Sequence, residues 1–449
     1  FFKFGKFFLL MTTAAMKASS SRYLLPLLII GSLFFVFGFV TWVNGALIPY
    51  LKIACELKSE MQSFLVVTAF FMAYFVMGIP SAMVLKRTGY KKGMSLGLLV
   101  MAVGTLAFIP AAYLRSFGLF LSGLFIIGTG LALLQTASNP YASIIGPIES
   151  AASRISIMGI CNKVAGILAN VVFGFIALQD TDALLSSLQH MDVAARSATL
   201  DALAMRVVNP YLIITLVLLA LAVAIYFSGL PDIKEEATTD TTANTATGKT
   251  SIWQFPHLLL GMLAIFLYVG VEVMAGDTII SYGITLGIPI TEAKFFTSAT
   301  LTCMLIGYIA GIFLIPKYIR QQDALKICAL LGALFSTLAI FTNGYTSVLF
   351  IALLGLANSL MWPAIFPLAI NKLGRFTKTG SALLVMSCAG GAILPLIYGY
   401  LTDSRTAYLI QQGVEAGIAK GMAAQVSYWM MIPCYLYVLY YAVRGHKVR

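Results

Sequence analysis

Charged side chains are scarce in this chain, because Asp, Glu, Lys and Arg together make up only 10% of its 449 residues. Hydrophobic residues make up 60%, and the mean hydropathy is +0.92. About a quarter of a typical soluble domain is charged, so this composition excludes that class of protein. The alternation of apolar and polar residues that is typical of membrane β-barrels is also absent. The composition therefore predicts membrane-spanning helices, which pair every backbone polar group within the segment.

Residues that usually carry catalysis or metal binding are few as well. The three histidines, His190, His257 and His446, fall in predicted loops or at the ends of apolar runs. The six cysteines show no C-x-x-C spacing, and the chain has neither a Walker A loop nor a nucleophile elbow. We therefore expect a protein that is not an enzyme, binds no cofactor and uses no ATP.

Twelve apolar runs follow one another along the chain, most of them near the roughly 20 residues that span a bilayer as a helix. They cover Tyr23–Tyr50, Ser59–Leu85, Gly93–Leu114, Leu119–Ile145, Ile155–Leu178, Pro210–Leu230, Pro256–Ile284, Phe295–Ile315, Ala324–Phe341, Ser347–Leu373, Ser381–Leu401 and Val426–Val443. The sequence thus predicts an all-α membrane protein with twelve transmembrane helices.

Basic residues are distributed unevenly over the predicted loops. If the N-terminus faces the cytoplasm, 20 Lys and Arg residues lie on the cytoplasmic side and 8 on the other, while Lys163 lies inside a helix. The positive-inside rule then places both termini in the cytoplasm. The formal net charge of +12 reflects this topology, so we expect no nucleic-acid partner.

Two polar stretches interrupt the apolar pattern. The first, Leu230–Pro256, is Thr-rich and has too little apolar surface to pack, so it reads as a cytoplasmic linker. The second, Gln179–Asn209, has leucines and alanines spaced for an amphipathic helix on the outer face, interpreted as a solvated cap.

The segments on either side of the linker repeat each other. LFIIGTGLA (Leu124–Ala132) returns as LFIALLGLA (Leu349–Ala357), 225 residues later. A parallel repeat of six helices is typical of transporters with a substrate site between two halves. We predict an N-terminal cytoplasmic tail (1–22), a first six-helix half (23–230), a cytoplasmic linker (231–255), a second six-helix half (256–443) and a C-terminal cytoplasmic tail (444–449).

Several polar side chains fall inside the apolar runs, where they are expected to face the interior of the bundle. Asn44 lies in the first run, and Gln135 and Asn139 lie four residues apart on one face of the fourth. Asn162 and Lys163 lie near the middle of the fifth. Amides and an ammonium group suit the hydroxyls of a neutral sugar, although packing between helices explains each of them as well.

Two acidic residues, Glu272 and Asp277, lie in the interior of the seventh run. A carboxylate in the membrane is costly enough that function is the first hypothesis, and it can bind a proton or a sodium ion. We predict a cation-coupling role for both residues, with a possible sodium ion near Glu272. The alternative is a structural carboxylate neutralised by Lys163 or by nearby amides.

Aromatic rings can pack on the C–H face of a sugar. The candidates are Trp42 and Tyr74 in the first half and Trp362 in the second. Asn358 and Trp362 are four residues apart, so a continuous helix would place an amide and a ring on one face. For any single aromatic residue, packing in the core is the alternative.

Three stretches carry a resemblance to a known family: FGFVTWVNGALIPYLK, LLQTASNPYASIIGPIESAASRISIMGICNKVAG and FLYVGVEVMAGDTI. Together they resemble the glucose/galactose permease branch of the fucose:proton symporter family, within the major facilitator superfamily. The likeness covers essentially the whole chain. It implies the major facilitator fold with two pseudo-symmetric halves, a bacterial inner membrane, and cation-coupled uptake of a monosaccharide. A sister group similar to it takes N-acetylglucosamine.

The chain departs from this family at three positions. The fucose permeases carry an Asp where this chain has Gly45 and a Glu where it has Gln135, and both acids are implicated in proton coupling. Neither residue here can titrate, so the resemblance shifts the coupling role to another carboxylate, with Glu272 first. A similar vertebrate transporter depends on sodium. Lys86 also replaces the usual Asp of the loop motif, which puts its gating role in doubt.

The sequence therefore predicts a secondary active transporter that imports a monosaccharide, glucose or galactose, with sodium or protons by alternating access. The alternatives are an N-acetylglucosamine:proton symporter, a passive hexose facilitator and, outside the transporters, a membrane sugar receptor. The expected partners are the sugar and the lipid bilayer. A monomer suffices, because the fold encloses its own pathway.

Overall fold

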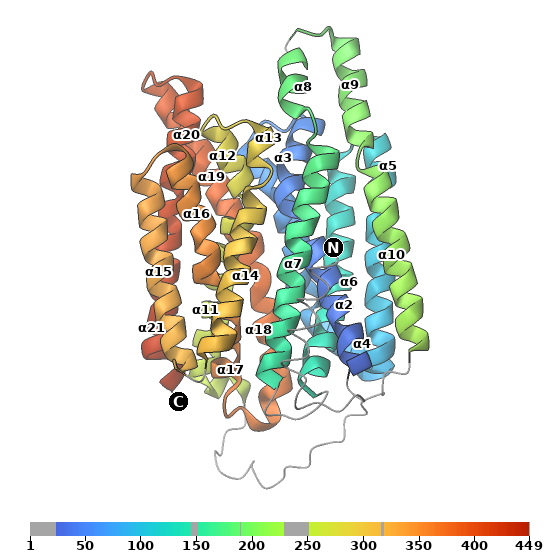
Figure 1. Ribbon diagram of the computed structural model, residues 1–449, viewed down its shortest axis with the longest axis vertical. Coiled ribbons are helices and arrows are strands. Elements are labelled where there is room, and N and C mark those ends of the chain that lie inside the picture. Colours follow the sequence, from blue (N-terminus) through green and yellow to red (C-terminus); the bar gives the residue numbers. More distant parts are fainter. Residues whose placement is uncertain (1–23, 145–150, 189, 229–250, 316–317, 449) are drawn as a thin grey trace.

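The computed structural model describes residues 24–144, 151–188, 190–228, 251–315 and 318–448, and within these ranges it contains helices and turns without any strand (Figure 1). Among the residues in these ranges, eleven helical stretches are long and apolar enough to cross a membrane. One of them, Glu60–Tyr113, has 54 residues and holds the second and third predicted spans. The predicted tail 1–22 and nearly all of the predicted linker lie outside the described residues.

The first half comprises α2 to α10. Its helices are α2 (Leu24–Trp42), α3 (Asn44–Ala54), α4 (Glu60–Leu106), α5 (Phe108–Tyr113), α6 (Phe117–Ile144), α7 (Ala151–Ala177), α8 (Thr181–Leu188), α9 (Val193–Met205) and α10 (Val208–Phe227). Local caps explain two of the starts. The hydroxyl of Ser59 accepts a hydrogen bond from the Gln62 amide at 3.0 Å before α4, and Asp192 caps α9 through the Ala195 amide at 2.9 Å.

The second half comprises α11 to α21. Its helices are α11 (Pro256–Asp277), α12 (Ile279–Thr285), α13 (Ile290–Ala293), α14 (Phe296–Leu314), α15 (Gln321–Phe341), α16 (Gly344–Asn358), α17 (Met361–Ile370), α18 (Thr377–Met386), α19 (Gly390–Gln411), α20 (Ala416–Ser427) and α21 (Met431–Val443). Short 3₁₀ turns precede, join or follow them: η3 (Ile252–Gln254), η4 (Gly374–Phe376), η5 (Ser387–Ala389), η6 (Tyr428–Met430) and η7 (Gly445–Lys447).

The second and third spans are joined by a single glycine instead of a loop. Gly89 has φ 74° and ψ 173°, a conformation that a side chain would strain, and the chain is helical on both sides of it. The predicted boundary between Leu85 and Gly93 is therefore a sharp reversal inside α4.

Several spans that were predicted as continuous helices are interrupted, among them the first, the seventh and the tenth. The first breaks at Val43 between α2 and α3, the seventh at Thr278 between α11 and α12, and the tenth between α16 and α17. Proline explains the last break, since Pro363 has no N–H to donate to the carbonyl four residues earlier. Backbone hydrogen bonds still cross two of these breaks, from the Leu47 amide to the Val43 carbonyl oxygen at 3.0 Å and from the Thr278 amide to the Met274 carbonyl oxygen at 3.2 Å.

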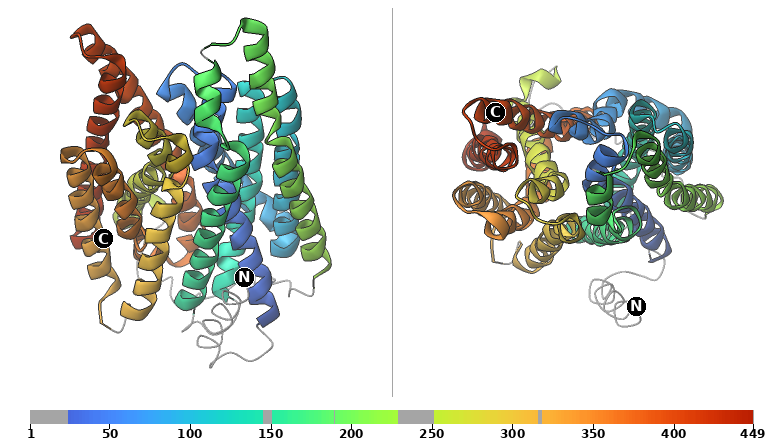
Figure 2. Two further views of the ribbon diagram at one scale, coloured as in Figure 1. Left: turned by 45° about the horizontal axis from the view of Figure 1, so that its top comes forward. Right: turned by 90° about the horizontal axis from the view of Figure 1, so that it is seen from above.

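The segment between α7 and α10 forms two helices, α8 and α9, which extend beyond one end of the bundle (Figures 1 and 2). The predicted helical cap at 179–209 is thus confirmed as helical. Tyr50 of α3 donates to the carbonyl oxygens of Leu203 (2.8 Å) and Ala204 (3.0 Å), which fastens α9 to the first span. We term this the α9 end of the bundle, and the opposite one, where α10 ends and α11 begins, the linker end.

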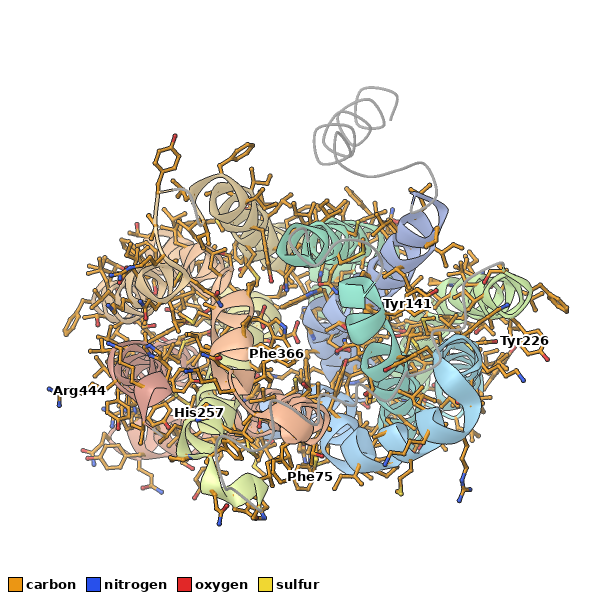
Figure 3. The ribbon with its side chains drawn as sticks, turned by 90° about the horizontal axis from the view of Figure 1, so that it is seen from below. Phe75, Tyr141, Tyr226, His257, Phe366 and Arg444 are labelled. Atoms are coloured by element: carbon orange, nitrogen blue, oxygen red, sulfur yellow. The ribbon has the colours of Figure 1, made fainter. Side chains whose placement is uncertain are left out.

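Two helix pairs make the most extensive contacts between the halves. α4 packs against α19, and α7 packs against α14. We term the packed pairs α4–α19 and α7–α14 the two seams. Viewed from above, the seams lie on opposite sides of the boundary between the halves (Figure 2). The view from below places Phe366 on α17 and Tyr141 on α6 near the middle of the bundle, in opposite halves (Figure 3).

Several helix crossings among the described residues allow only a glycine, and the closest one in each half illustrates this. A Cβ on Gly38 of α2 would lie 1.8 Å from the carbonyl oxygen of Asn162 on α7, and one on Gly390 of α19 would lie 1.7 Å from the carbonyl oxygen of Phe266 on α11. Gly38 and Phe266 are 228 positions apart, and so are Asn162 and Gly390. The two crossings are therefore equivalent in the repeat, although the glycine has moved to the other helix of the pair.

Candidate functional site

An ion pair inside the bundle joins the two halves. The Nζ atom of Lys163 on α7 lies 3.1 Å from Oε1 of Glu272 on α11. Only 7% of the lysine side chain and 12% of the glutamate side chain are exposed. Both lie within membrane-spanning segments, where an ionised group is costly unless it has a partner. This contact corresponds to the alternative in which Lys163 neutralises the carboxylate.

Trp42, at the end of α2 in the first span, contacts the lysine of this pair. The ammonium of Lys163 lies 4.2 Å from the centroid of its ring, a cation–π contact. The indole Nε1 donates to Oδ1 of Asn162 at 3.1 Å. Because only 4% of Trp42 is exposed and Lys163 covers its ring, in this structure the indole orients the lysine.

Asn170 belongs to the same group and was missed in the sequence. Its Nδ2 donates to the carbonyl oxygen of Trp42 at 2.6 Å and to that of Gly166 at 3.0 Å. The first contact satisfies a carbonyl at the break between α2 and α3. An amide inside the apolar stretch ILANVVFG was the available signal, the same one that identified Asn44.

Asp277 is a second buried acidic residue on α11. It ends α11, five residues after Glu272, and is 1% exposed. Its Oδ1 has no hydrogen-bond partner among the described residues. The membrane-spanning part of α7 and α11 therefore contains one basic and two acidic side chains, which would carry a net charge of −1 if all three were ionised.

A second polar contact joins α4 and α6 within the first half. Nε2 of Gln135 donates to the hydroxyl of Tyr74 at 3.0 Å. Tyr74 is 2% exposed and stacks on Phe71, with 5.8 Å between ring centroids. The structure thus brings together two residues that were predicted separately. Asn139, predicted on the same face as Gln135, falls within α6, but its side chain lies outside the described part of the chain.

The predicted pair on the tenth span is separated by the helix break. Asn358 ends α16, is fully buried and accepts a hydrogen bond from the hydroxyl of Tyr435 at 3.0 Å. Trp362 lies on α17, is half-buried, and stacks on Phe366 with 5.6 Å between ring centroids. The expectation that one continuous helical face presents both groups therefore does not hold, because the helix is interrupted at Ser359 and Leu360.

Asn44 is the most isolated of the predicted residues. It begins α3 and is fully buried, and neither polar atom of its side chain has a hydrogen-bond partner in the described part of the chain. At the neighbouring Gly45, a Cβ would lie 2.5 Å from Oγ1 of Thr297, whose hydroxyl donates to the carbonyl oxygen of Gly276 at 2.6 Å. A side chain at position 45 would therefore disturb the contact between the first span and α14.

No group of three or more His, Cys, Asp or Glu residues within the described ranges could hold a metal ion. The ionisable side chains that lie inside the bundle include Lys163 on α7 and Glu272 and Asp277 on α11. Helices from both halves contribute to this set, as expected for a site between two repeats.

Comparison with protein families identifies this arrangement. Residues 30–395 match the family model of the Major Facilitator Superfamily. The chain belongs to the major facilitator superfamily. This confirms the predicted family and the predicted class of fold, a multi-pass helical membrane protein.

Individual members of the superfamily resemble the chain along most of its length. It is 33% identical over 437 residues to a protein of Brucella abortus named glucose/galactose transporter, with 96% of each chain covered. It is 30% identical over 397 residues to the L-fucose-proton symporter of Escherichia coli, covering 86% of this chain and 88% of that one. The crystal structure of an E. coli fucose:proton symporter variant matches with a TM-score of 0.67 at 28% identity, covering 94% of this chain and 98% of that one.

Proposed function

We propose that this protein imports a monosaccharide, glucose or galactose, together with a sodium ion or a proton, by alternating access. The observation that carries the proposal is the buried ion pair between Lys163 and Glu272. It joins the two halves within the membrane-spanning segments, where charged groups mark ion and substrate pathways. The names of the relatives from Brucella abortus and E. coli support a sugar as substrate and coupling to a cation.

The charge balance of the site supports coupling. If Lys163, Glu272 and Asp277 were all ionised, a bound proton or sodium ion would bring the group to neutrality. A change of partner for Lys163 would then accompany release of the cation, since the pair spans the boundary that moves. Glu272 is proposed as the main coupling residue and Asp277 as the second.

The proposed orientation in the membrane is supported by the distribution of basic residues. The linker end carries the larger number of Lys and Arg residues, which supports a cytoplasmic location for it and for both termini. The membrane is then the inner membrane, and the protein acts as a transporter and not as an enzyme. The α9 end faces the periplasm.

Counterflow in proteoliposomes tests the proposed substrate class without a cation gradient. Vesicles loaded with unlabelled glucose should take up labelled glucose or galactose transiently, and empty lipid vesicles should not. The same assay with N-acetylglucosamine separates the alternative substrate. Binding of sugar without counterflow would contradict the proposal and favour a receptor.

Replacing Trp362 with alanine should weaken sugar affinity by roughly 1 kcal/mol or more, because a ring that packs on the sugar would be lost. Trp362 suits this role better than the buried Trp42, since its ring is only half-buried. The affinity is measured by the sugar concentration that half-saturates counterflow. Trp253→Ala is the matched control, because Trp253 is 63% exposed in the 3₁₀ turn before α11. Unchanged affinity in W362A would remove this residue from the site.

A further inference from the structure

Two carboxylates at the α9 end connect the halves through backbone amides. Asp403 of α19 accepts hydrogen bonds from the amides of Glu60 and Met61, each at 2.9 Å. Those amides begin α4, and the first amides of a helix have no partner within it. One carboxylate of the second half therefore caps a helix of the first half with both of its oxygens.

The reciprocal contact is present at the other seam. Asp182 of α8 accepts from the amide of Ile290 at 2.9 Å and from the amide of Thr291 at 3.0 Å, and the Thr291 hydroxyl adds a third bond at 2.8 Å. These groups begin α13, immediately before α14. Here a carboxylate of the first half caps a helical turn of the second half.

The capped amides of the two caps are equivalent in the internal repeat. Glu60 and Met61 are each 230 positions before Ile290 and Thr291, which is close to the offset of 228 between the glycine crossings. Asp182 follows the fifth span, and Asp403 lies 221 positions later within α19 of the eleventh, so the two acids come from equivalent spans but not from equivalent positions. The contact is thus made twice, once at each seam of the boundary, and both copies lie at the α9 end (Figure 1).

A cationic side chain supports each cap. Lys420 of α20 lies 2.8 Å from the buried carboxylate of Glu60, which also pairs with Lys52. At the other seam, Nζ of Lys294 lies 4.9 Å from the ring centroid of Phe175 on α7. Both are further contacts between the halves. Each cap is therefore accompanied by a second contact across the same seam, an ion pair at the first and a cation–π contact at the other.

We propose that these two caps, which we term the seam latches, hold the α9 end closed and release together when that end opens. The inference rests on the proposed function, because alternating access requires the halves to separate at this end. A rigid-body rocking motion would remove Asp403 from α4 and Asp182 from α13 in one movement. Four backbone amides would then lose their partners, which favours the closed state of this end.

Amide hydrogen exchange, followed by mass spectrometry in peptides covering residues 59–63 and 289–293, tests this coupling. Asp403→Asn removes the charge and one acceptor at the first seam. The expected result is faster exchange there and, because opening is shared, about tenfold faster exchange at Ile290 and Thr291 on the other seam. Asp182→Asn should give the converse pattern at Glu60 and Met61. Faster exchange confined to the seam that carries the substitution would overturn the proposal.

Two further variants keep the test decisive. Asp201→Asn is the control, because this α9 carboxylate is at the same end but pairs with Arg115 of its own half at 3.3 Å. In this variant the amides at both seams should exchange at the wild-type rate. Thr291→Val removes only the hydroxyl bond to Asp182, and a roughly threefold rise at Glu60 and Met61 is expected even where D182N does not fold. No rise in that variant would contradict the latch. Exchange needs neither sugar nor gradient, so coupled exchange without counterflow would reject the proposed function alone.

Discussion

Replacing Glu272 with glutamine is expected to abolish accumulation of sugar against a gradient while leaving sugar exchange intact. Glutamine keeps the size of the side chain but cannot bind a proton and carries no charge for a cation. One coupled charge moving through 100 mV contributes roughly 2.3 kcal/mol, or about a 50-fold concentration ratio. In E272Q this ratio should fall to about one. Proteoliposomes under an imposed gradient measure accumulation, and counterflow measures exchange.

The same substitution leaves Lys163 without its partner, so stability must be separated from coupling. Removing one member of a buried ion pair typically costs about 3–5 kcal/mol, because the remaining charge is not compensated. The double variant Lys163→Gln with Glu272→Gln removes both charges and should recover part of the thermal stability in detergent. It should still fail to accumulate sugar. Full accumulation in E272Q would remove Glu272 from the coupling site.

Gly38→Ala is expected to destabilise the fold and to slow transport at least about tenfold. The added methyl group would lie 1.8 Å from the carbonyl oxygen of Asn162, a backbone atom that cannot move aside as a side chain can. α2 must then shift away from α7, and overpacking of this kind typically costs about 1–3 kcal/mol, sometimes more. The shift also displaces Asn162 from Trp42. The midpoint of thermal unfolding and the counterflow rate measure the two effects.

Gly118→Ala provides the matched control for this substitution. Gly118 also lies in a helix, but a Cβ there meets nothing within 4 Å. Alanine is the better helix former, so this variant should be as stable as the wild type or slightly more so. If G38A unfolded at the same temperature as G118A, the close crossing of α2 and α7 would not be essential to the fold.

Hydropathy and the repeat were sufficient to predict the fold class, because membrane-spanning helices depend on local composition more than on distant contacts. The contact between Lys163 and Glu272 was foreseen as one alternative, since two opposite charges inside apolar runs need a partner. The interruption at Pro363 could have been anticipated from the missing N–H. The breaks at Val43 and Thr278 depend on packing between spans, and no local pattern indicates them.

The arrangement of other groups could not be inferred from residue type. Trp42 was predicted to contact a sugar, but its ring is covered by Lys163, a residue 121 positions away. Asp182 and Asp403 looked like ordinary loop and helix-end acids. Their partners are backbone amides in the other half. Almost every residue has a backbone amide, so residue types do not indicate which amides these carboxylates bind. The roles of the predicted substrate-binding residues stay predictions for the variants above.

Labelled glucose uptake into proteoliposomes, under an inward sodium gradient or an inward proton gradient at matched membrane potential, tests the central claim most directly. A site with one ammonium and two carboxylates predicts accumulation above equilibrium with one of these cations, and loss of that accumulation in E272Q. Accumulation driven by sodium alone would assign a sodium ion to the site, and accumulation driven by protons alone would assign a titrating carboxyl group. Equilibration without accumulation under both gradients would contradict coupling and make the protein a passive facilitator.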